Sequence, residues 1–135
     1  SSRGEQNIAD YIAKQNMSVF VMDYDHNAPT GEHLENTHYR FYKIIREKNP
    51  TLPIIMASMP NQDLRPTYRA ERRDIIRATY ERAIAEGDQY VWFVDGVTLF
   101  GDEDRDACTM DGAHPNDLGF SLFSENLIKE MQKYL

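Results

Sequence analysis

The chain has 135 residues, which is enough for one domain with a hydrophobic core, and its 41% of hydrophobic residues exclude a disordered composition. Its net charge of −7 argues against nucleic acids and anionic membranes as partners, because both require clustered positive charge. A single cysteine, Cys108, excludes an internal disulfide, and no apolar run approaches the ~20 residues of a membrane span. We therefore expect a soluble protein, and the sequence leaves open whether it is exported.

Three apolar runs, at residues 18–24, 52–57 and 89–95, divide the chain. They are rich in β-branched and aromatic residues and apolar on both faces, which is typical of strands buried in a parallel sheet. Helices are expected before, between and after them, at residues 7–15, 34–48, 68–86 and within 115–135. This alternation predicts a three-layer α/β/α fold of the flavodoxin-like kind, in which helices cover both faces of a parallel sheet.

The predicted sheet has an unsatisfied edge. Three strands are fewer than the roughly five of a typical sheet, and residues 18–24 would invite aggregation as an exposed edge. We expect their missing neighbour to come from sequence outside residues 1–135 or from another chain, including a second copy of this one. The chain does not begin with Met, which points to a removed leader or to a larger parent protein.

The candidate site residues fall on loops that follow the expected strands, where sheets of this class place their chemistry. The last of these loops contains Asp111 and His114. At this spacing the carboxylate can hydrogen-bond the imidazole, fix its tautomer and leave the other ring nitrogen free to take a proton from a nucleophile. The alternative is that Pro115 and Asn116 only start the last helix and that His114 is incidental.

The loop after the first strand holds Asp23, Asp25, His26 and Asn27. The Asn27 amide can donate to an oxyanion, which is worth on the order of 3–4 kcal/mol in acyl transfer, unless this segment is only a turn. Asp25 and His26 are candidates for substrate contact. A metal site formed by Asp23, Asp25 and His26 with His114 is a further alternative, since oxygen and imidazole ligands suit metals. The spacing matches no defined metal motif, however, so we expect no metal.

Three other side chains, on or near the same strands and loops, are weaker candidates for the site. Ser58 ends the second strand, but it lacks the flanking glycines of a nucleophile elbow, so we expect a loop hydroxyl or a substrate contact. Cys108 could form a Cys–His–Asp set with the last loop, although its spacing gives no special geometry. Trp92 lies within the third strand and is expected in the core.

These residues resemble the SGNH (GDSL-type) hydrolases, a family of serine esterases and acylhydrolases. Residues 111–119, Asp-Gly-Ala-His-Pro-Asn-Asp-Leu-Gly, are similar to the last sequence block of that family, in which an Asp and a His supply two members of a triad. The loop that ends at Asn27 resembles the third block, whose Asn donates to the oxyanion. The resemblance spans about residues 7–133 and implies a parallel sheet of five strands, of which this chain looks like the last three.

Two blocks of the family are not recognisable in the sequence: the first, with the nucleophilic Ser, and the second, with a Gly that also donates to the oxyanion. We therefore interpret residues 1–135 as a single partial domain, the C-terminal portion of an SGNH-like hydrolase. The resemblance implies a parent protein that hydrolyses a small ester, such as an acylated carbohydrate or a lipid-like ester, without a cofactor. The chain alone is expected to be inactive. The alternative is a non-catalytic, flavodoxin-like binding or interaction module that a partner strand completes.

Overall fold

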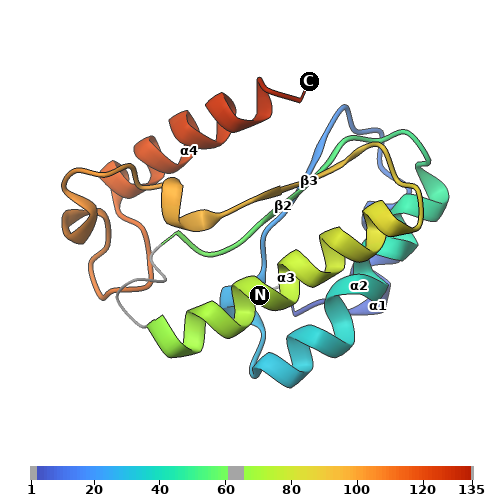
Figure 1. The fold of residues 1–135 in the computed structure, drawn as a ribbon, viewed down its shortest axis with the longest axis horizontal. Helices are drawn as coiled ribbons and strands as arrows, with labels where there is room; N and C mark the ends of the chain where they lie inside the picture. Colours follow the sequence, from blue (N-terminus) through green and yellow to red (C-terminus); the bar gives the residue numbers. More distant parts are fainter. Residues whose placement is uncertain (1–2, 61–65, 135) are drawn as a thin grey trace.

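The computed structural model describes residues 3–60 and 66–134, with the backbone alone at residues 66–69. Within these residues the helices and strands follow one another in the predicted alternation (Figure 1). In chain order the elements are α1 (Gln6–Ile12), β1 (Phe20–Met22), η1 (Asp25–Asn27), α2 (Gly31–Lys48), β2 (Ile54–Ala57), α3 (Pro66–Ala85), β3 (Val91–Val94), η3 (Gly96–Thr98), η4 (Arg105–Cys108) and α4 (Asp117–Met131), where η marks a 3₁₀-helix.

The strands form one parallel sheet in the order β1-β2-β3, which confirms the predicted α/β class. Phe20 pairs with Ile54, and Ile54 pairs with Val91. The central strand β2 is wholly buried, which explains its unbroken apolar sequence. β1 is shorter than predicted because the chain leaves the sheet early. Tyr24 packs in the core beside Phe41 instead, with ring centroids 5.4 Å apart.

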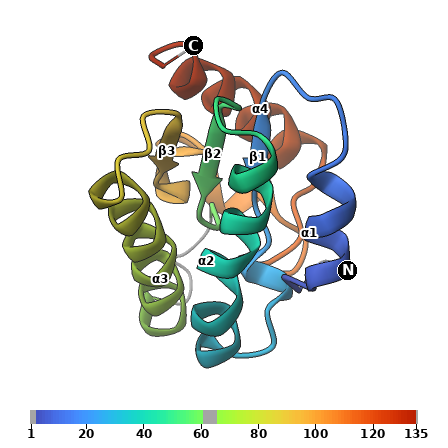
Figure 2. The same ribbon diagram turned by 90° about the vertical axis from the view of Figure 1, so that its right-hand side faces the viewer.

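Helices cover both faces of the sheet (Figure 2). α2 and α3 pack side by side on one face, with α1 beside α2, and the larger core lies between these helices and the strands. α4 lies on the other face, where Phe123 and Leu127 pack against Ile55 and Val94. The sheet is therefore the middle layer of a three-layer α/β/α arrangement.

Local sequence signals set the ends of the helices. The Thr30 hydroxyl accepts a backbone hydrogen bond from the first turn of α2 at 3.0 Å, so this helix begins earlier than predicted. Gly87 follows α3 with a φ of +91°, a left-handed conformation that favours glycine and ends helices. The Asn116 side chain caps α4 by accepting from the N–H of Gly119 at 3.0 Å. This cap fixes the start of α4 directly after the His114 loop.

The outer edge of the sheet, at β1, has no pairing strand among the described residues. Across the described part of the chain β1 pairs with β2 alone, so its expected outer neighbour stays a prediction, as does the interpretation of residues 1–135 as a single partial domain. None of the helices in the same residues has the combination of length and apolar character that crossing a membrane requires.

Candidate active site

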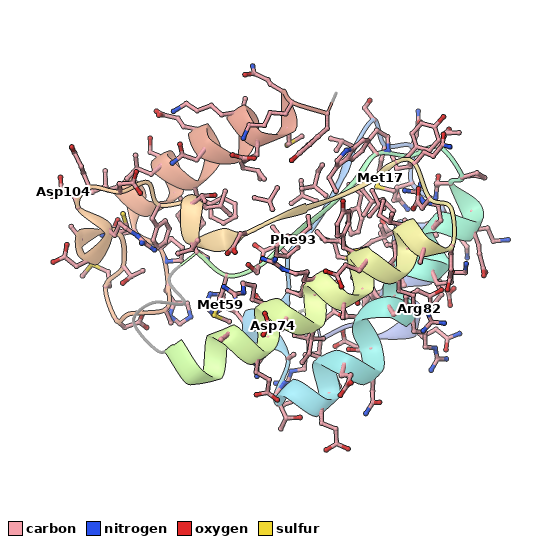
Figure 3. The ribbon with its side chains drawn as sticks, in the orientation of Figure 1. Met17, Met59, Asp74, Arg82, Phe93 and Asp104 are labelled. Atoms are coloured by element: carbon pink, nitrogen blue, oxygen red, sulfur yellow. The ribbon has the colours of Figure 1, made fainter. Side chains whose placement is uncertain are left out.

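The loops that follow the strands meet at one end of the sheet and enclose a cleft of about 400 Å³. Figure 3 shows Met59 and Asp104 at this end of the molecule and Met17 at the other. The cleft brings together residues from all three loops and from α4: Asp23, Tyr24, His26, Asn27, Pro60, Ala113, His114, Pro115, Phe120 and Phe123 line it.

Asp111 and His114 are hydrogen-bonded to each other at the mouth of this cleft. Nδ1 of His114 lies 2.6 Å from Oδ2 of Asp111. Oδ1 of Asp111 accepts the backbone N–H groups of His114 and Ala113 at 2.8 and 2.9 Å. The His114 backbone amide, followed by its ring and the Ala113 amide, holds the pKa of the Asp111 carboxyl well below its usual range. The ionised carboxylate therefore faces a protonated Nδ1, which leaves Nε2 as the proton acceptor.

The loop that carries His114 is closed on itself by backbone hydrogen bonds. Thr109 and Pro115 form an isolated antiparallel bridge, and the N–H of Met110 donates to the His114 carbonyl at 3.3 Å. The Asn116 amide donates to the Ala107 carbonyl at 2.7 Å. These contacts join the two ends of residues 107–116 into a short strap, which holds the exposed imidazole of His114 in place.

Asn27 lies at the end of η1 and also lines the cleft. Its backbone N–H donates to the Tyr24 carbonyl at 3.0 Å, which fixes the turn. The side chain is exposed, and no hydrogen bond within residues 3–60 and 66–134 engages its amide. The amide is therefore available to donate to a group bound beside His114, and its role in oxyanion stabilisation stays a prediction.

The structure corrects the substrate contact predicted for Asp25, and of the two roles predicted for Ser58 it supports the loop hydroxyl. Both side chains are fully buried. Oδ2 of Asp25 accepts the N–H of Met59 at 3.0 Å, and the Ser58 hydroxyl accepts the N–H of Gly96 at 2.9 Å. Both side chains are thus turned away from solvent and bonded to backbone N–H groups of neighbouring loops. His26 is exposed and lines the cleft, so a substrate contact stays a prediction for it.

The Cys–His–Asp alternative is not supported by the environment of Cys108. The thiol is buried and donates to the Asp104 carbonyl at 3.5 Å. Burial raises the pKa of this thiol, so it stays protonated near neutral pH. Within the residues that the structure describes, no three His, Cys, Asp or Glu side chains form a group that could hold a metal ion.

Two acidic side chains beside Asn27 have altered pKa values. Burial, and to a smaller extent the neighbouring charge of Asp23, raise the pKa of Asp25 to about 7. Asp23 lines the cleft and keeps contact with solvent, yet partial removal of water by the surrounding protein raises its pKa to about 6. Because the Asp23 side chain is exposed, solvent screens part of this effect.

Sequence reasoning missed the apolar wall of the cleft. Phe120 and Phe123 lie one turn apart on α4, and Phe120 is 61% exposed. Their spacing places them on one side of the helix that starts directly after His114, which was a usable signal. Pro60 joins this wall from the β2 loop, and no local feature of its sequence indicates that position.

The site is thus an Asp–His pair and an exposed Asn side chain at the carboxyl end of a parallel α/β sheet. The sequence matches the family model of the GDSL-like lipases and acylhydrolases over residues 1–132, and the chain belongs to this family. Comparison with curated protein sequences gives no match.

Solved structures share the fold. A GDSL-like lipase from Bacteroides ovatus is similar with a TM-score of 0.84 and 21% identity, over 99% of this chain and 41% of its own. A salicylyl-acyltransferase from a tetracycline biosynthetic pathway gives 0.80 and 23%, over 98% and 42% of the two chains. An active-site mutant of a family two carbohydrate esterase from Clostridium thermocellum gives 0.67 and 19%, over 91% and 38%. The chain thus spans about two fifths of the length of these proteins.

Proposed function

We propose that the parent protein hydrolyses a carboxylic ester through a serine nucleophile, with Asp111, His114 and Asn27 in its active site. The observation that carries this proposal is the 2.6 Å hydrogen bond between Asp111 and His114 at the cleft that Asn27 also lines. The family of the chain supports an acylhydrolase activity, since lipases and acylhydrolases give that family its description.

The proposed reaction has two stages. Nε2 of His114 takes the proton of the serine hydroxyl as the oxygen attacks the ester carbonyl, and Asp111 stabilises the resulting imidazolium. The Asn27 amide donates to the tetrahedral oxyanion. His114 then returns the proton to the departing alkoxide, which leaves an acyl-serine. In the second stage His114 activates a water molecule in the same way, and the acid and the free serine are released.

The nucleophile is proposed to come from outside residues 1–135. Among the described serines, Ser58 is buried and Ser18, Ser121 and Ser124 do not line the cleft. The chain alone is therefore proposed to be inactive toward esters, and no metal or organic cofactor takes part in the proposed reaction.

The proposed substrate is a small ester, such as an O-acetylated carbohydrate. The similarity of fold to a carbohydrate esterase supports a sugar ester. The side chains of Phe120 and Phe123 offer an apolar wall for the acyl group or for one face of a sugar ring. A lipid-like ester is the other candidate, because the same wall would contact an alkyl chain.

The test uses the full-length protein with 4-nitrophenyl acetate and a fluorophosphonate probe that labels activated serines. His114→Ala is compared with His33→Ala, which removes a histidine that does not line the cleft. We expect His114→Ala to lower kcat by about 10³-fold or more and to suppress labelling, because the serine loses its base. His33→Ala should retain both. Hydrolysis that survives His114→Ala would overturn the proposal.

A non-catalytic binding module is the second candidate function. The observation in its favour is that no described serine lines the cleft beside His114. This candidate predicts a full-length protein with no fluorophosphonate labelling and no ester hydrolysis, whether or not His114 is present.

A further inference from the structure

Asp25 is a fully buried carboxyl and the first residue of η1, the turn that ends at Asn27 in the cleft. We propose that Asp25 is a positioning residue: it fixes η1 so that the Asn27 amide is placed to donate a hydrogen bond to the oxyanion. This inference rests on the proposed function, since it assigns a role to Asp25 within the same reaction.

Asp25 ties its own loop to the two elements that pack against it. Its Oδ2 accepts the backbone N–H of Met59, in the loop after β2, at 3.0 Å. Its carbonyl oxygen accepts a hydrogen bond from the guanidinium of Arg72 on α3, and this arginine is also fully buried. η1 is thus anchored on one side by the β2 loop and on the other by α3. Asn27 follows Asp25 by two residues in the same turn, so the contacts of Asp25 also fix the position of the Asn27 amide.

The segment that binds Asp25, residues 58–60, also contacts the part of the chain that leads to His114. The residue before Met59, Ser58, accepts the N–H of Gly96 at 2.9 Å. Gly96 packs so tightly that a Cβ atom there would lie 2.0 Å from the Ser58 carbonyl oxygen. On the other side of Met59, the Pro60 carbonyl accepts from Arg105 on η4 at 3.4 Å. The same short segment therefore contacts the loop with Asn27 and the region that leads to His114.

Burying the Asp25 carboxyl at this position lowers the stability of the folded protein. Burial and the charge of Asp23 raise its pKa, and the backbone N–H groups of Met59 and His26 counter this only in part. The contacts with Met59 and Arg72 offset only part of this cost. An apolar side chain would fill a buried site at a lower cost in stability, and such departures from the most stable choice are expected at functional sites. Stability alone therefore does not explain this carboxyl.

The test is a double-mutant cycle between Asp25 and Asn27 in the full-length protein, with kcat and KM for 4-nitrophenyl acetate as readouts. We expect Asp25→Ala to lower kcat by about 10- to 100-fold with little change in KM, because a displaced donor weakens transition-state binding. Asp25→Asn should retain most of kcat, since its amide oxygen can accept from Met59. In an Asn27→Ala background, Asp25→Ala should have almost no further effect on kcat.

A merely structural role would not give this pattern, because a general loss of stability would add to the effect of Asn27→Ala. Additive effects of Asp25→Ala and Asn27→Ala, or an unchanged kcat in Asp25→Ala, would overturn the inference while the hydrolase proposal stands. If Asp25→Ala does not fold, Asp25→Glu takes its place in the cycle, because it keeps a carboxyl group and displaces the acceptor by one methylene. A full-length protein without His114-dependent hydrolysis would overturn both proposals.

Discussion

Nδ1 of His114 lies 2.6 Å from Oδ2 of Asp111, while the other oxygen of Asp111 accepts two backbone amides of the same loop. One carboxylate thereby orients the imidazole and shapes the loop that carries it. Both side chains are largely exposed, at 53% for Asp111 and 86% for His114. The fixed geometry of this pair therefore comes from a local network of hydrogen bonds and not from burial in the core.

Replacing Asp111 by Asn should lower kcat of the full-length protein by about 10²–10⁴-fold. The amide can keep a backbone contact through its oxygen, but its NH₂ group would face Nδ1 and favour the tautomer that cannot accept a proton at Nε2. Esterase kinetics measure the effect. Asp106→Asn, which removes another exposed carboxylate from η4, is the matched control and should retain wild-type kinetics. Equal rates for Asp111→Asn and the wild type would contradict the assigned role.

Asn27→Ala should lower kcat by about 10²–10³-fold with a small change in KM, because the amide is proposed to donate to the oxyanion and not to the ground-state ester. Asn36→Ala removes an exposed amide from α2, outside the cleft, and should leave both constants unchanged. Steady-state kinetics of the two variants side by side give the comparison. A rise in KM with an unchanged kcat would instead indicate that Asn27 only binds the substrate.

Features that depend on a short stretch of sequence could be predicted well. The apolar runs gave the parallel sheet, because a strand buried on both faces requires them. The spacing of Asp111 and His114 predicted their contact, because both lie on one short loop. The family resemblance led to Asn27, which lines the same cleft as His114.

Features that depend on distant parts of the chain could not be predicted. Asp25 and Ser58 look like accessible loop residues, and their burial follows from Met59 and Gly96, which reach them from other loops. A polar residue that finds its partner only after the loops assemble gives no signal in its own segment. The same holds for the lengths of the strands, which end where loop residues such as Tyr24 find better packing in the core.

Arg46→Met should lower the free energy of unfolding by about 3–5 kcal/mol, because the buried carboxylate of Asp88 loses its cationic partner and keeps only the Tyr42 hydroxyl and the Tyr90 N–H. The side chains of Arg46 and Asp88 are 10% and 6% exposed and lie 2.7 Å apart. Lys43→Met is the control: it removes an exposed ion pair with Glu86 and should cost about 0–1 kcal/mol. Urea unfolding of both variants measures the difference. Similar losses in the two variants would show that burial does not govern these pairs.

Gly119→Ala should destabilise the strap that holds His114. A Cβ atom at Gly119 would lie 2.2 Å from the Cys108 carbonyl oxygen, so α4 or the strap must shift. Overpacking of this kind costs about 1–3 kcal/mol. Ser121→Ala, at an exposed position of the same helix, should stay close to the wild type. The check is urea unfolding together with esterase kcat, and a Gly119→Ala protein of unchanged stability and activity would show that the close contact is not required.

The two carboxyls beside Asn27 should give the protein an unusual dependence of stability on pH. The pKa of Asp25 rises from its ordinary value of 3.8 to about 7 on folding, so between these pH values the folded state binds more protons than the unfolded state. The free energy of unfolding therefore falls as the pH rises through this window, by at most about 1.4 kcal/mol per pH unit for one group. Asp23 acts in the same direction.

Asp25→Asn should flatten this decline, because an amide does not titrate. Urea unfolding of the wild type and the variant at pH 4.5, 5.5, 6.5 and 7.5, spaced to cover the window of about three pH units, measures the two slopes. Asp111 affects stability in the opposite direction. Its pKa is lowered on folding, so it adds stability at pH values above its pKa in the unfolded state, and this contribution is lost only as the pH falls below about 4. Asp111→Asn should therefore keep the wild-type slope in the measured range. A slope that Asp25→Asn leaves unchanged would show that the buried carboxyl does not take up a proton on folding.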